Sequence, residues 1–277
     1  MLTQLDVHKV EKPWGRNDLK PPFANAEAAD QPRIGEYWYQ QNAGAADAPL
    51  LIKYLFTSEK LSVQVHPNDK MAEARGYKCG KTECWYVVDA TPDAVLGLGL
   101  KQETNADTLR AASLSGAVEE MIDWKPTKAG DIWYVEAGTV HAIGPGLTLI
   151  EVQQNIDLTY RLYDYGRPRE LHLDDGIAVS TPGPYAMTNY SHFDGEAVVH
   201  QWPHFGMALC SDAEQAKAIC AENRKPHYCV PVKGNSSVSG KALNVGHVYH
   251  MKESDTGDGI AMDRESVLLI AWPNKKV

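Results

Sequence analysis

Short runs of apolar, β-branched and aromatic residues recur along the chain, separated by turn-forming residues. The clearest are 50–56 (LLIKYLF), 83–88 (ECWYVV), 132–135 (IWYV) and 147–152 (LTLIEV). Runs of this length and composition are typical of β-strands and too short for most helices. We therefore expect an all-β fold in which these runs are the central strands.

Helices are expected only as insertions into this β scaffold. Residues 105–122 (NADTLRAASLSGAVEEMI) carry apolar side chains at near-helical spacing. In 67–76 (PNDKMAEARG), Asn68 or Asp69 is suited to cap a short helix that Gly76 would end. Both segments predict connectors between strands.

The order of the runs predicts two β units. The polar stretch 57–60 separates two strand-like runs, 50–56 and 61–65, as in a β-hairpin. After about residue 172, Pro and Gly punctuate shorter runs. We therefore expect a metal-binding catalytic domain over residues 1–172, with a helical insertion, and a smaller C-terminal β domain over residues 173–277.

Composition narrows the function classes. The hydrophobic fraction of 43% and the charged fraction of 23% are ordinary for a globular protein. With 27 Lys and Arg against 36 Asp and Glu, the formal charge is −9, and the basic residues form no long run. Nucleic acid is therefore not an expected partner.

The sequence also bears on location and on its cysteines. The first twelve residues contain no apolar signal region, and the late apolar run 267–272 is far shorter than a membrane span. We therefore expect a cytoplasmic protein without membrane contact. Its five cysteines are odd in number and lack CxxC spacing, which favours free thiols.

Four side chains of metal-ligating type fall on predicted strands. Gln64 and His66 are two residues apart in LSVQVHP, so they leave one face of a strand. Glu83 begins the run ECWYVV. His141 follows a glycine turn after the strand IWYV. Each could point into the interior of one barrel.

A lone strand histidine is more often a hydrogen-bonded structural residue than a metal ligand. Four such residues within fewer than about a hundred positions make a shared ion the better interpretation. Two imidazole nitrogens and two oxygens suit a divalent ion, with zinc preferred and manganese, iron, cobalt and nickel left open. We expect one ion per chain.

Further polar residues accompany these four. Lys81 lies two residues before Glu83 and therefore on the same face if the strand extends to it. Glu151, Gln153, Asn155 and Arg161 share parity along EVQQNIDLTYR, as if they lined one wall of a pocket. A solvent-facing strand would also carry alternating polar residues.

The segments LSVQVHP, GKTECWYV, the glycine-rich approach to His141 and EVQQNIDLTYRLYD, together with KPWG at 12–15, resemble type I phosphomannose isomerases in their short bacterial form. The resemblance covers about residues 12 to 172. It implies a cupin fold, that is, a jelly-roll β-barrel. It further implies a single zinc ion and the interconversion of mannose 6-phosphate and fructose 6-phosphate.

The resemblance implies zinc ligation by Gln64, His66, Glu83 and His141. It places Lys81, Glu151 and Arg161 in the substrate pocket. Lys81 and Glu151 are the candidates for the base and acid that move a proton between two carbons, and a nearby cation would lower the pKa of Lys81.

An anionic substrate needs local positive charge in this acidic protein. Arg161 offers a planar fork for the phosphate or for a developing oxyanion. Arg167 and Arg169 are weaker phosphate candidates, because arginines near turns are usually solvated.

Two other functions fit the same residues. His66, Glu83 and His141 also form the two-His, one-carboxylate set of iron-dependent oxygenases. A non-catalytic sugar-phosphate-binding cupin would keep the pocket without turnover. The sequence leaves the oligomeric state open.

Overall fold

The structure is a computed structural model that describes residues 2–23, 32–40, 48–223, 227–252 and 257–274. Strands dominate it, as the all-β expectation requires. The helices within these ranges are α1 (Asp69–Glu73), α2 (Ala106–Ser115), α3 (Val118–Met121), α4 (Leu173–Val179), α5 (Ala213–Glu222) and the 3-10 turn η1 (Met187–Asn189). No helix among the described residues is both long enough and apolar enough to span a bilayer.

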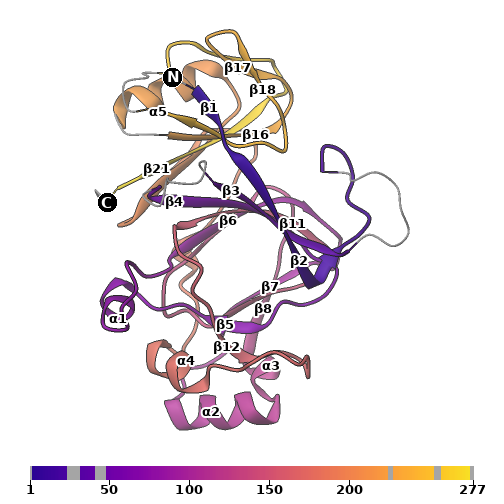
Figure 1. Cartoon of the computed structure of the whole chain (residues 1–277), viewed down its shortest axis with the longest axis vertical. Helices are drawn as coiled ribbons and strands as arrows, with labels where there is room; N and C mark the ends of the chain where they lie inside the picture. Colours follow the sequence, from indigo (N-terminus) through magenta and orange to yellow (C-terminus); the bar gives the residue numbers. More distant parts are fainter. Residues whose placement is uncertain (1, 24–31, 41–47, 224–226, 253–256, 275–277) are drawn as a thin grey trace.

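Two antiparallel sheets form the walls of a barrel (Figure 1). Within the described residues, the larger sheet has the order β13 (Tyr190–His192), β9 (Asp131–Val135), β6 (Glu83–Ala90), β11 (Leu147–Gln154), β4 (Leu50–Phe56), β3 (Ile34–Gln40), β2 (Asp6–Arg16). The smaller sheet has the order β12 (Tyr160–Tyr163), β5 (Val63–Val65), β10 (His141–Ile143), β7 (Val95–Leu100), β8 (Ile122–Pro126). This is the expected cupin architecture, and helices α2, α3 and α4 gather at one end of it.

A second group of strands follows in the C-terminal part. Within the described residues its main sheet has the order β1 (Leu2–Gln4), β19 (Tyr249–Met251), β16 (His227–Lys233), β21 (Val267–Pro273), β15 (Phe205–Cys210), β14 (Val198–Gln201). A small sheet has the order β18 (Lys241–Leu243), β17 (Ser236–Val238), β20 (Ile260–Met262). Helix α5 packs beside them (Figure 1).

We expected the chain to divide after residue 172, but two strands pair with a sheet on the other side of that boundary. Strand β1, near the N-terminus, pairs with β19, so that Leu2 lies opposite Met251. Strand β13 pairs with β9 of the barrel, with Tyr190 opposite Trp133. Each unit is therefore completed by a segment from the other half of the sequence.

The two units share a hydrophobic core. Side chains on the outer face of β4, including Tyr54 and Phe56, belong to the same buried cluster as Phe205 and Tyr228 of the C-terminal sheet. Sheet-on-sheet packing of this kind buries alternate residues of each strand. The C-terminal sheet therefore covers the apolar outer face of the barrel, and the opposite face of β4 is left to point inward.

The hairpin expected from residues 50–65 is wrong. Strand β4 pairs with β3 and β11, whereas β5 pairs with β10 and β12 of the other sheet. Thr57, between them, donates its hydroxyl to the carbonyl of Gly144 at 2.8 Å. The intervening residues thus carry the chain from one barrel wall to the other.

The expected helices are present, although α1 ends at Glu73, before the Gly76 that was expected to end it. Asn68 accepts a hydrogen bond from the backbone N–H of Met71 and caps α1. Asn105 caps α2 in the same way, and Gly116 ends that helix at a φ of 85°. The five cysteines are free thiols, as expected.

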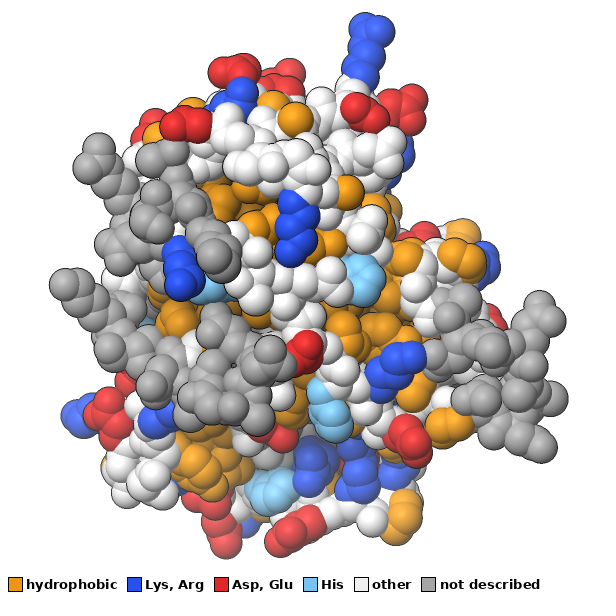
Figure 2. Space-filling view, turned by 45° about the horizontal axis from the view of Figure 1, so that its top comes forward, with side chains coloured by type: hydrophobic (Ala, Val, Ile, Leu, Met, Phe, Trp, Pro, Cys, Tyr) orange, Lys and Arg blue, Asp and Glu red, His pale blue; other side chains and the backbone are white. Residues whose placement is uncertain are grey.

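The surface carries mixed charge. On the face shown in Figure 2, basic, acidic and hydrophobic side chains are all present, and several basic side chains gather in its lower part. This distribution agrees with the absence of a basic run in the sequence.

Candidate metal centre

Three ligand-type side chains meet inside the barrel. His66 follows β5, Glu83 opens β6 and His141 opens β10. His66 Nε2 lies 3.5 Å from Glu83 Oε2, and His141 Nε2 lies 3.4 Å from Glu83 Oε1. One ligand atom from each residue falls within 4.8 Å of the others. None of the three residues is more than 1% exposed, so the group is fully enclosed.

Backbone turns bring the two histidines together. Gly138 adopts a φ of 93° in the turn before β10, a conformation that favours glycine. Its N–H donates to the carbonyl of His66 at 2.8 Å. This bond ties the approach to His141 directly to the other histidine.

Both imidazoles are oriented by a backbone carbonyl. His66 Nδ1 lies 2.9 Å from the carbonyl oxygen of Leu158, and His141 Nδ1 lies 2.9 Å from that of Thr139. A carbonyl can only accept, so each Nδ1 carries the proton. In the neutral ring Nε2 then presents its lone pair to Glu83, as in many metal-binding histidines.

Electrostatics favour the ligand form of all three residues. Burial, reinforced by the charge of Lys81, lowers the pKa of His66 to about 3. Burial also lowers the pKa of His141. Burial alone would raise the pKa of Glu83, but Lys81 and His66 outweigh it and lower that pKa well below its usual range. The group is therefore two neutral imidazoles and one carboxylate.

The carboxylate of Glu83 fits a cation better than it fits its protein neighbours. Neither oxygen has a hydrogen-bond partner of acceptable geometry among the described residues. Lys81 Nζ lies 3.0 Å from Oε2 as an ion-pair contact. A buried carboxylate without hydrogen bonds is costly. A divalent ion between Glu83 and the two Nε2 atoms would satisfy it.

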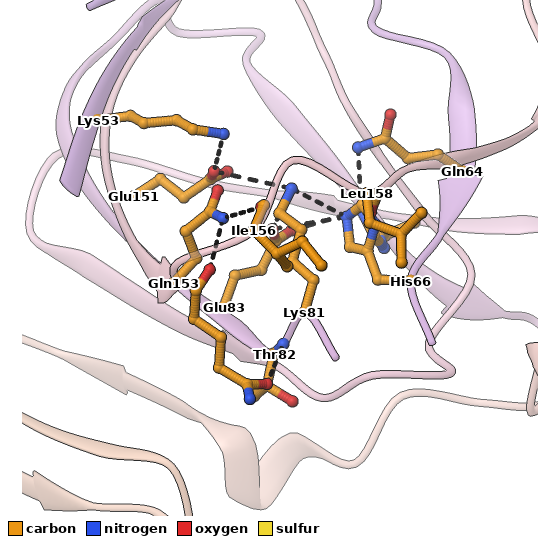
Figure 3. A network of polar contacts seen from close by, with 12 residues as sticks. Lys53, Gln64, His66, Lys81, Thr82, Glu83, Glu151, Gln153, Ile156 and Leu158 are labelled. Carbon is orange, nitrogen blue, oxygen red and sulfur yellow. Dashed lines mark hydrogen bonds and ion pairs between the residues drawn. The ribbon is translucent and has the colours of Figure 1, made fainter. Parts of the chain in front are cut away.

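Gln64 stands beside the three ligands. It lies opposite His141 in the pairing of β5 with β10, and its Nε2 is 3.2 Å from His141 Nε2 (Figure 3). Its Oε1 accepts a hydrogen bond from Ser62 at 3.1 Å. Ligation through Oε1 requires the opposite amide orientation, which occupies the same volume.

Lys81 and Glu151 adjoin the cluster (Figure 3). Lys81 Nζ lies 3.2 Å from His66 Nε2 and 3.9 Å from Glu151 Oε1. Burial alone would lower the pKa of Lys81, but Glu83 and Glu151 raise it above its usual range. The protein's own charges thus oppose the lowering that we expected from a cation.

The position of Lys81 depends on a close backbone approach. A Cβ on Gly80 would meet the backbone of Asn68 at 2.4 Å, so no larger residue fits there. The N–H of Lys81 donates to the carbonyl of Pro67 at 3.0 Å. The residue after His66 therefore holds the backbone of Lys81.

The row of residues expected along 151–161 is broken, and that expectation is wrong. Strand β11 ends at Gln154 and β12 begins at Tyr160 in the other sheet. Gln153 donates to the carbonyl of Ile156 at 2.7 Å and so fixes the bend. Asn155 donates instead to Ala48. Only Glu151 and Arg161 of the row line the cavity beside the cluster.

That cavity has a volume of about 400 Å³ and opens between the two barrel walls. Gln64, Lys81, Glu151 and Arg161 all line it. Arg161, on β12, lies directly opposite Gln64 on β5. His66, Glu83 and His141 are not among its lining residues; they adjoin it through Lys81 and Gln64, which contact the two histidines.

Sequence reasoning missed a buried lysine and its partners. Lys53 Nζ lies 3.1 Å from Glu151 Oε1, with both side chains 4% exposed. Trp85 donates its indole N–H to Glu151 Oε2 at 3.1 Å. Lys53 is the single charge in LLIKYLF, and a lysine within so apolar a strand was the available signal.

A second missed ion pair lies at the wall formed by β2 and β3. Lys12 Nζ is 3.2 Å from Glu36 Oε1, and Trp38 donates its indole N–H to the other oxygen. The charges of Lys53 and Lys12 hold the pKa of Glu36 low, although burial acts to raise it. Basic and acidic side chains thus alternate across the barrel interior.

Comparison with known proteins points to one family. The chain is 46% identical over 138 residues to the mannose-6-phosphate isomerase ManA of Bacillus subtilis (strain 168), which is 47% of this chain and 44% of that protein. It is 40% identical over 220 residues to the mannose-6-phosphate isomerase of Streptococcus mutans, which is 66% of this chain and 68% of that protein. The match with ManA thus spans less than half of that relative. No protein-family profile matches the chain.

Solved structures share the fold over almost the whole chain. The crystal structure of the mannose 6-phosphate isomerase from Bacillus subtilis has a TM-score of 0.72 and 22% identity, covering 97% of this chain and 98% of that one. A zinc-bound mannose 6-phosphate isomerase has a TM-score of 0.71 and 14% identity, covering 99% and 100%. At these identities the likeness concerns the fold.

Proposed function

The chain belongs to the mannose-6-phosphate isomerase family, and from that premise we propose that it interconverts mannose 6-phosphate and fructose 6-phosphate. The observation that carries the proposal is the meeting of His66, Glu83 and His141 beside Lys81 and Glu151. Ligand-type side chains thus lie next to the residues proposed for proton transfer, and these residues line a cavity of about 400 Å³, which supports the proposal.

Zinc is the proposed resident ion. Two neutral imidazoles and an otherwise unsatisfied carboxylate form a three-residue donor set of the kind used in catalytic zinc sites, and the zinc-bound relative of the same fold supports this choice. Gln64 would supply a fourth donor after its amide is reversed. The bound ion would act as a Lewis acid toward the oxygens of the substrate.

Isomerisation requires a proton to leave one carbon and reach its neighbour. Glu151, held by Lys53 and Trp85, presents a fixed carboxylate and is the proposed acceptor. Lys81 lies between the carboxylates of Glu83 and Glu151, which favours its ammonium form. It is therefore the proposed donor, the reverse of the base role expected from the sequence. Arg161 is the proposed anchor for negative charge on the substrate.

We also propose that residues 1–172 form the catalytic domain and residues 173–277 a supporting domain. Every residue assigned above lies within 1–172. The part from residue 173 onward supports the catalytic part, because the C-terminal sheet covers the outer face of β4. The inner face of β4 presents Lys53 to the cavity. A cytoplasmic location stays a prediction.

A coupled assay tests the reaction. Purified protein is supplied with mannose 6-phosphate, and fructose 6-phosphate is measured before chelation, after chelation and after zinc is restored. We expect turnover that chelation abolishes and zinc restores. A protein that binds mannose 6-phosphate without turnover in any state would contradict the proposal and support a non-catalytic binding role.

The three-residue donor set alone also suits an iron-dependent oxygenase. The same purified protein, loaded with ferrous iron, separates the two by its oxygen consumption. We expect none above the background rate of free iron. The buried Lys81, Lys53 and Glu151 favour the isomerase, because proton transfer needs such groups beside the metal.

A further inference from the structure

The segment 80–82, which carries Lys81 to the cavity, lies just outside the regular sheet. Strand β6 begins at Glu83, and its pairing with both neighbouring strands starts at that residue, with Val135 on one side and Gln153 on the other. The ladder therefore holds Glu83 but not Lys81. The position of Lys81 must be fixed by contacts outside the regular pairing.

The three successive backbone N–H groups of this segment all donate to fixed acceptors: from Gly80 to Asp69 Oδ1 at 3.0 Å, from Lys81 to the Pro67 carbonyl at 3.0 Å, and from Thr82 to Gln154 Oε1 at 2.9 Å. Two of these acceptors are side chains, those of Asp69 and Gln154. A backbone acceptor is present whatever the residue type, whereas a side-chain acceptor is lost on substitution. The support of the segment therefore depends on the identity of these two residues.

Asp69 and Gln154 also hold each other. Gln154 Nε2 donates to Asp69 Oδ1 at 2.8 Å, the same oxygen that accepts from Gly80. A carboxylate only accepts and a backbone N–H only donates, so the contacts with Asp69 and Thr82 fix the orientation of the Gln154 amide. Gln154 is 7% exposed, and a buried amide without partners is costly. We call these linked hydrogen bonds the Asp69–Gln154 tie.

The tie lies outside the substrate cavity. Asp69 and Gln154 line a separate hollow of about 330 Å³, and neither of them lines the cavity that Lys81 lines. His204 of the C-terminal part lines this hollow too, with Nδ1 3.7 Å from Asp69 Oδ2. The two oxygens of Asp69 thus face different ways, and Oδ1 alone accepts from Gly80 and Gln154. Any effect of the tie on a substrate must pass through the segment that carries Lys81.

We propose that Asp69 and Gln154 are positioning residues, which fix the backbone of residues 80–82 and so hold the ammonium group of Lys81 beside the candidate metal centre. The inference rests on the proposed function for the role of Lys81. A proton donor misplaced by about 1 Å can lower the rate on the order of a hundredfold. An acid in the first turn of a helix usually stabilises that helix, but the hydrogen bonds of Asp69 reach beyond α1 to this segment.

Substitutions at Asp69 separate the tie from a helix effect. Asp69→Ala removes the shared acceptor, and we expect kcat for mannose 6-phosphate to fall about 10-fold to 100-fold with KM little changed. Zinc content should stay the same, because the ladder holds Glu83. Asp69→Asn keeps an oxygen that can accept both hydrogen bonds and should recover most of kcat. Asp107→Ala also removes an acid from the first turn of an Asn-capped helix and should match the wild type.

A second variant tests the other half of the tie. Gln154→Met keeps a side chain of similar length but can neither accept from Thr82 nor donate to Asp69. It should lower kcat to a similar extent, and the double variant Asp69→Ala/Gln154→Met should lose little more than either single variant, because linked residues are not additive.

Amide hydrogen exchange, followed by NMR, reports on the tie without reference to the reaction. In Asp69→Ala the exchange of the Gly80 amide should speed up by about tenfold or more, as expected when one hydrogen bond is lost. The Thr82 amide should exchange faster as well, since the Gln154 amide loses one of its two anchors. Asp107→Ala should change neither rate.

The outcomes separate the tie from the reaction. Unchanged exchange at Gly80 in Asp69→Ala would overturn the inference, and so would near-normal kcat in Asp69→Ala or in Gln154→Met. Equal losses of kcat in Asp69→Asn and Asp69→Ala would assign the effect to the charge and also overturn it, as would a loss of zinc that accompanies the loss of kcat. If the wild type lacks isomerase activity with zinc bound, yet exchange changes as expected, the tie stands and the proposed reaction falls.

Discussion

Lys53 and Glu151 face each other inside the barrel, with Nζ 3.1 Å from Oε1. They are direct cross-strand neighbours of opposite charge, because Lys53 on β4 lies opposite Glu151 on β11. Lys81 Nζ lies 3.9 Å from the same oxygen. The pair links β4, which packs outward on the C-terminal sheet, to the residues proposed for proton transfer.

Loss of Lys53 should destabilise the protein. Lys53→Met leaves the Glu151 carboxylate buried with a weaker partner, and we expect unfolding free energy to fall by about 3–5 kcal/mol. Urea-induced unfolding measures this change in unfolding free energy. The double variant Lys53→Met/Glu151→Gln should recover most of the loss, and the exposed control Lys241→Met should change stability by less than about 0.5 kcal/mol. A loss below about 1 kcal/mol in Lys53→Met would mean that the pair is not essential to the fold.

Loss of one imidazole should release the metal. His141→Ala removes a proposed ligand that the Thr139 carbonyl holds in the ligating tautomer, and we expect zinc content per chain to fall to near zero after dialysis. Metal analysis of the purified variant checks this, with the exposed His8→Ala as the control that keeps its zinc. Full zinc retention in His141→Ala would move the site elsewhere.

Loss of Arg161 should affect turnover and leave the metal in place. Arg161 lines the cavity, whereas His66, Glu83 and His141 are not among its lining residues. Arg161→Ala should lower kcat/KM for mannose 6-phosphate by about a hundredfold or more, with zinc content unchanged. Near-normal kinetics would remove Arg161 from the site, and the partly exposed Arg110→Ala, which loses an ion pair with Asp174, serves as the control for loss of a charge outside the cavity.

The metal-free protein should lose stability in acid partly through His66. Its pKa is about 3 in the folded protein against an ordinary value of 6.5. Between these values the unfolded chain takes up a proton that the folded protein refuses, so unfolding free energy falls as pH falls, by up to about 1.4 kcal/mol per pH unit. Chemical unfolding of the chelated protein at pH 6, 5 and 4 measures this slope.

The matched variant for this slope is His66→Gln, which cannot titrate in that range. Its unfolding free energy should fall less steeply with acid than that of the wild type. Parallel curves for the two proteins would show that His66 is protonated in the folded state at those pH values.

The sequence predicted the strands and named the three side chains that meet as the candidate metal centre, because both leave a local signal. A β-branched run such as that of β4 and the two-residue spacing of Gln64 and His66 depend only on neighbours in the chain. Pairing does not. The change of sheet after Thr57 depends on contacts between segments far apart in sequence. So does the pairing of β1 with β19 and of β13 with β9, which joins each of these strands to the other unit.

The residues that sequence reasoning missed share one physical property. Lys53, Glu36 and Lys12 act through partners on neighbouring strands, and each alone looks like a charged residue at a strand surface. Arg161 was assigned correctly to the cavity, but through a row with Gln153 that the bend after Gln154 breaks. Barrel closure, not parity along one strand, brings Arg161 opposite Gln64.

The position of a bound zinc ion tests the central claim most directly. Crystals of the zinc-loaded protein, measured at the zinc absorption edge, should show one strong anomalous peak about 2.0–2.2 Å from His66 Nε2, His141 Nε2 and a carboxylate oxygen of Glu83. A fully occupied peak at any other place in the molecule, with these three side chains still in mutual contact, would contradict it.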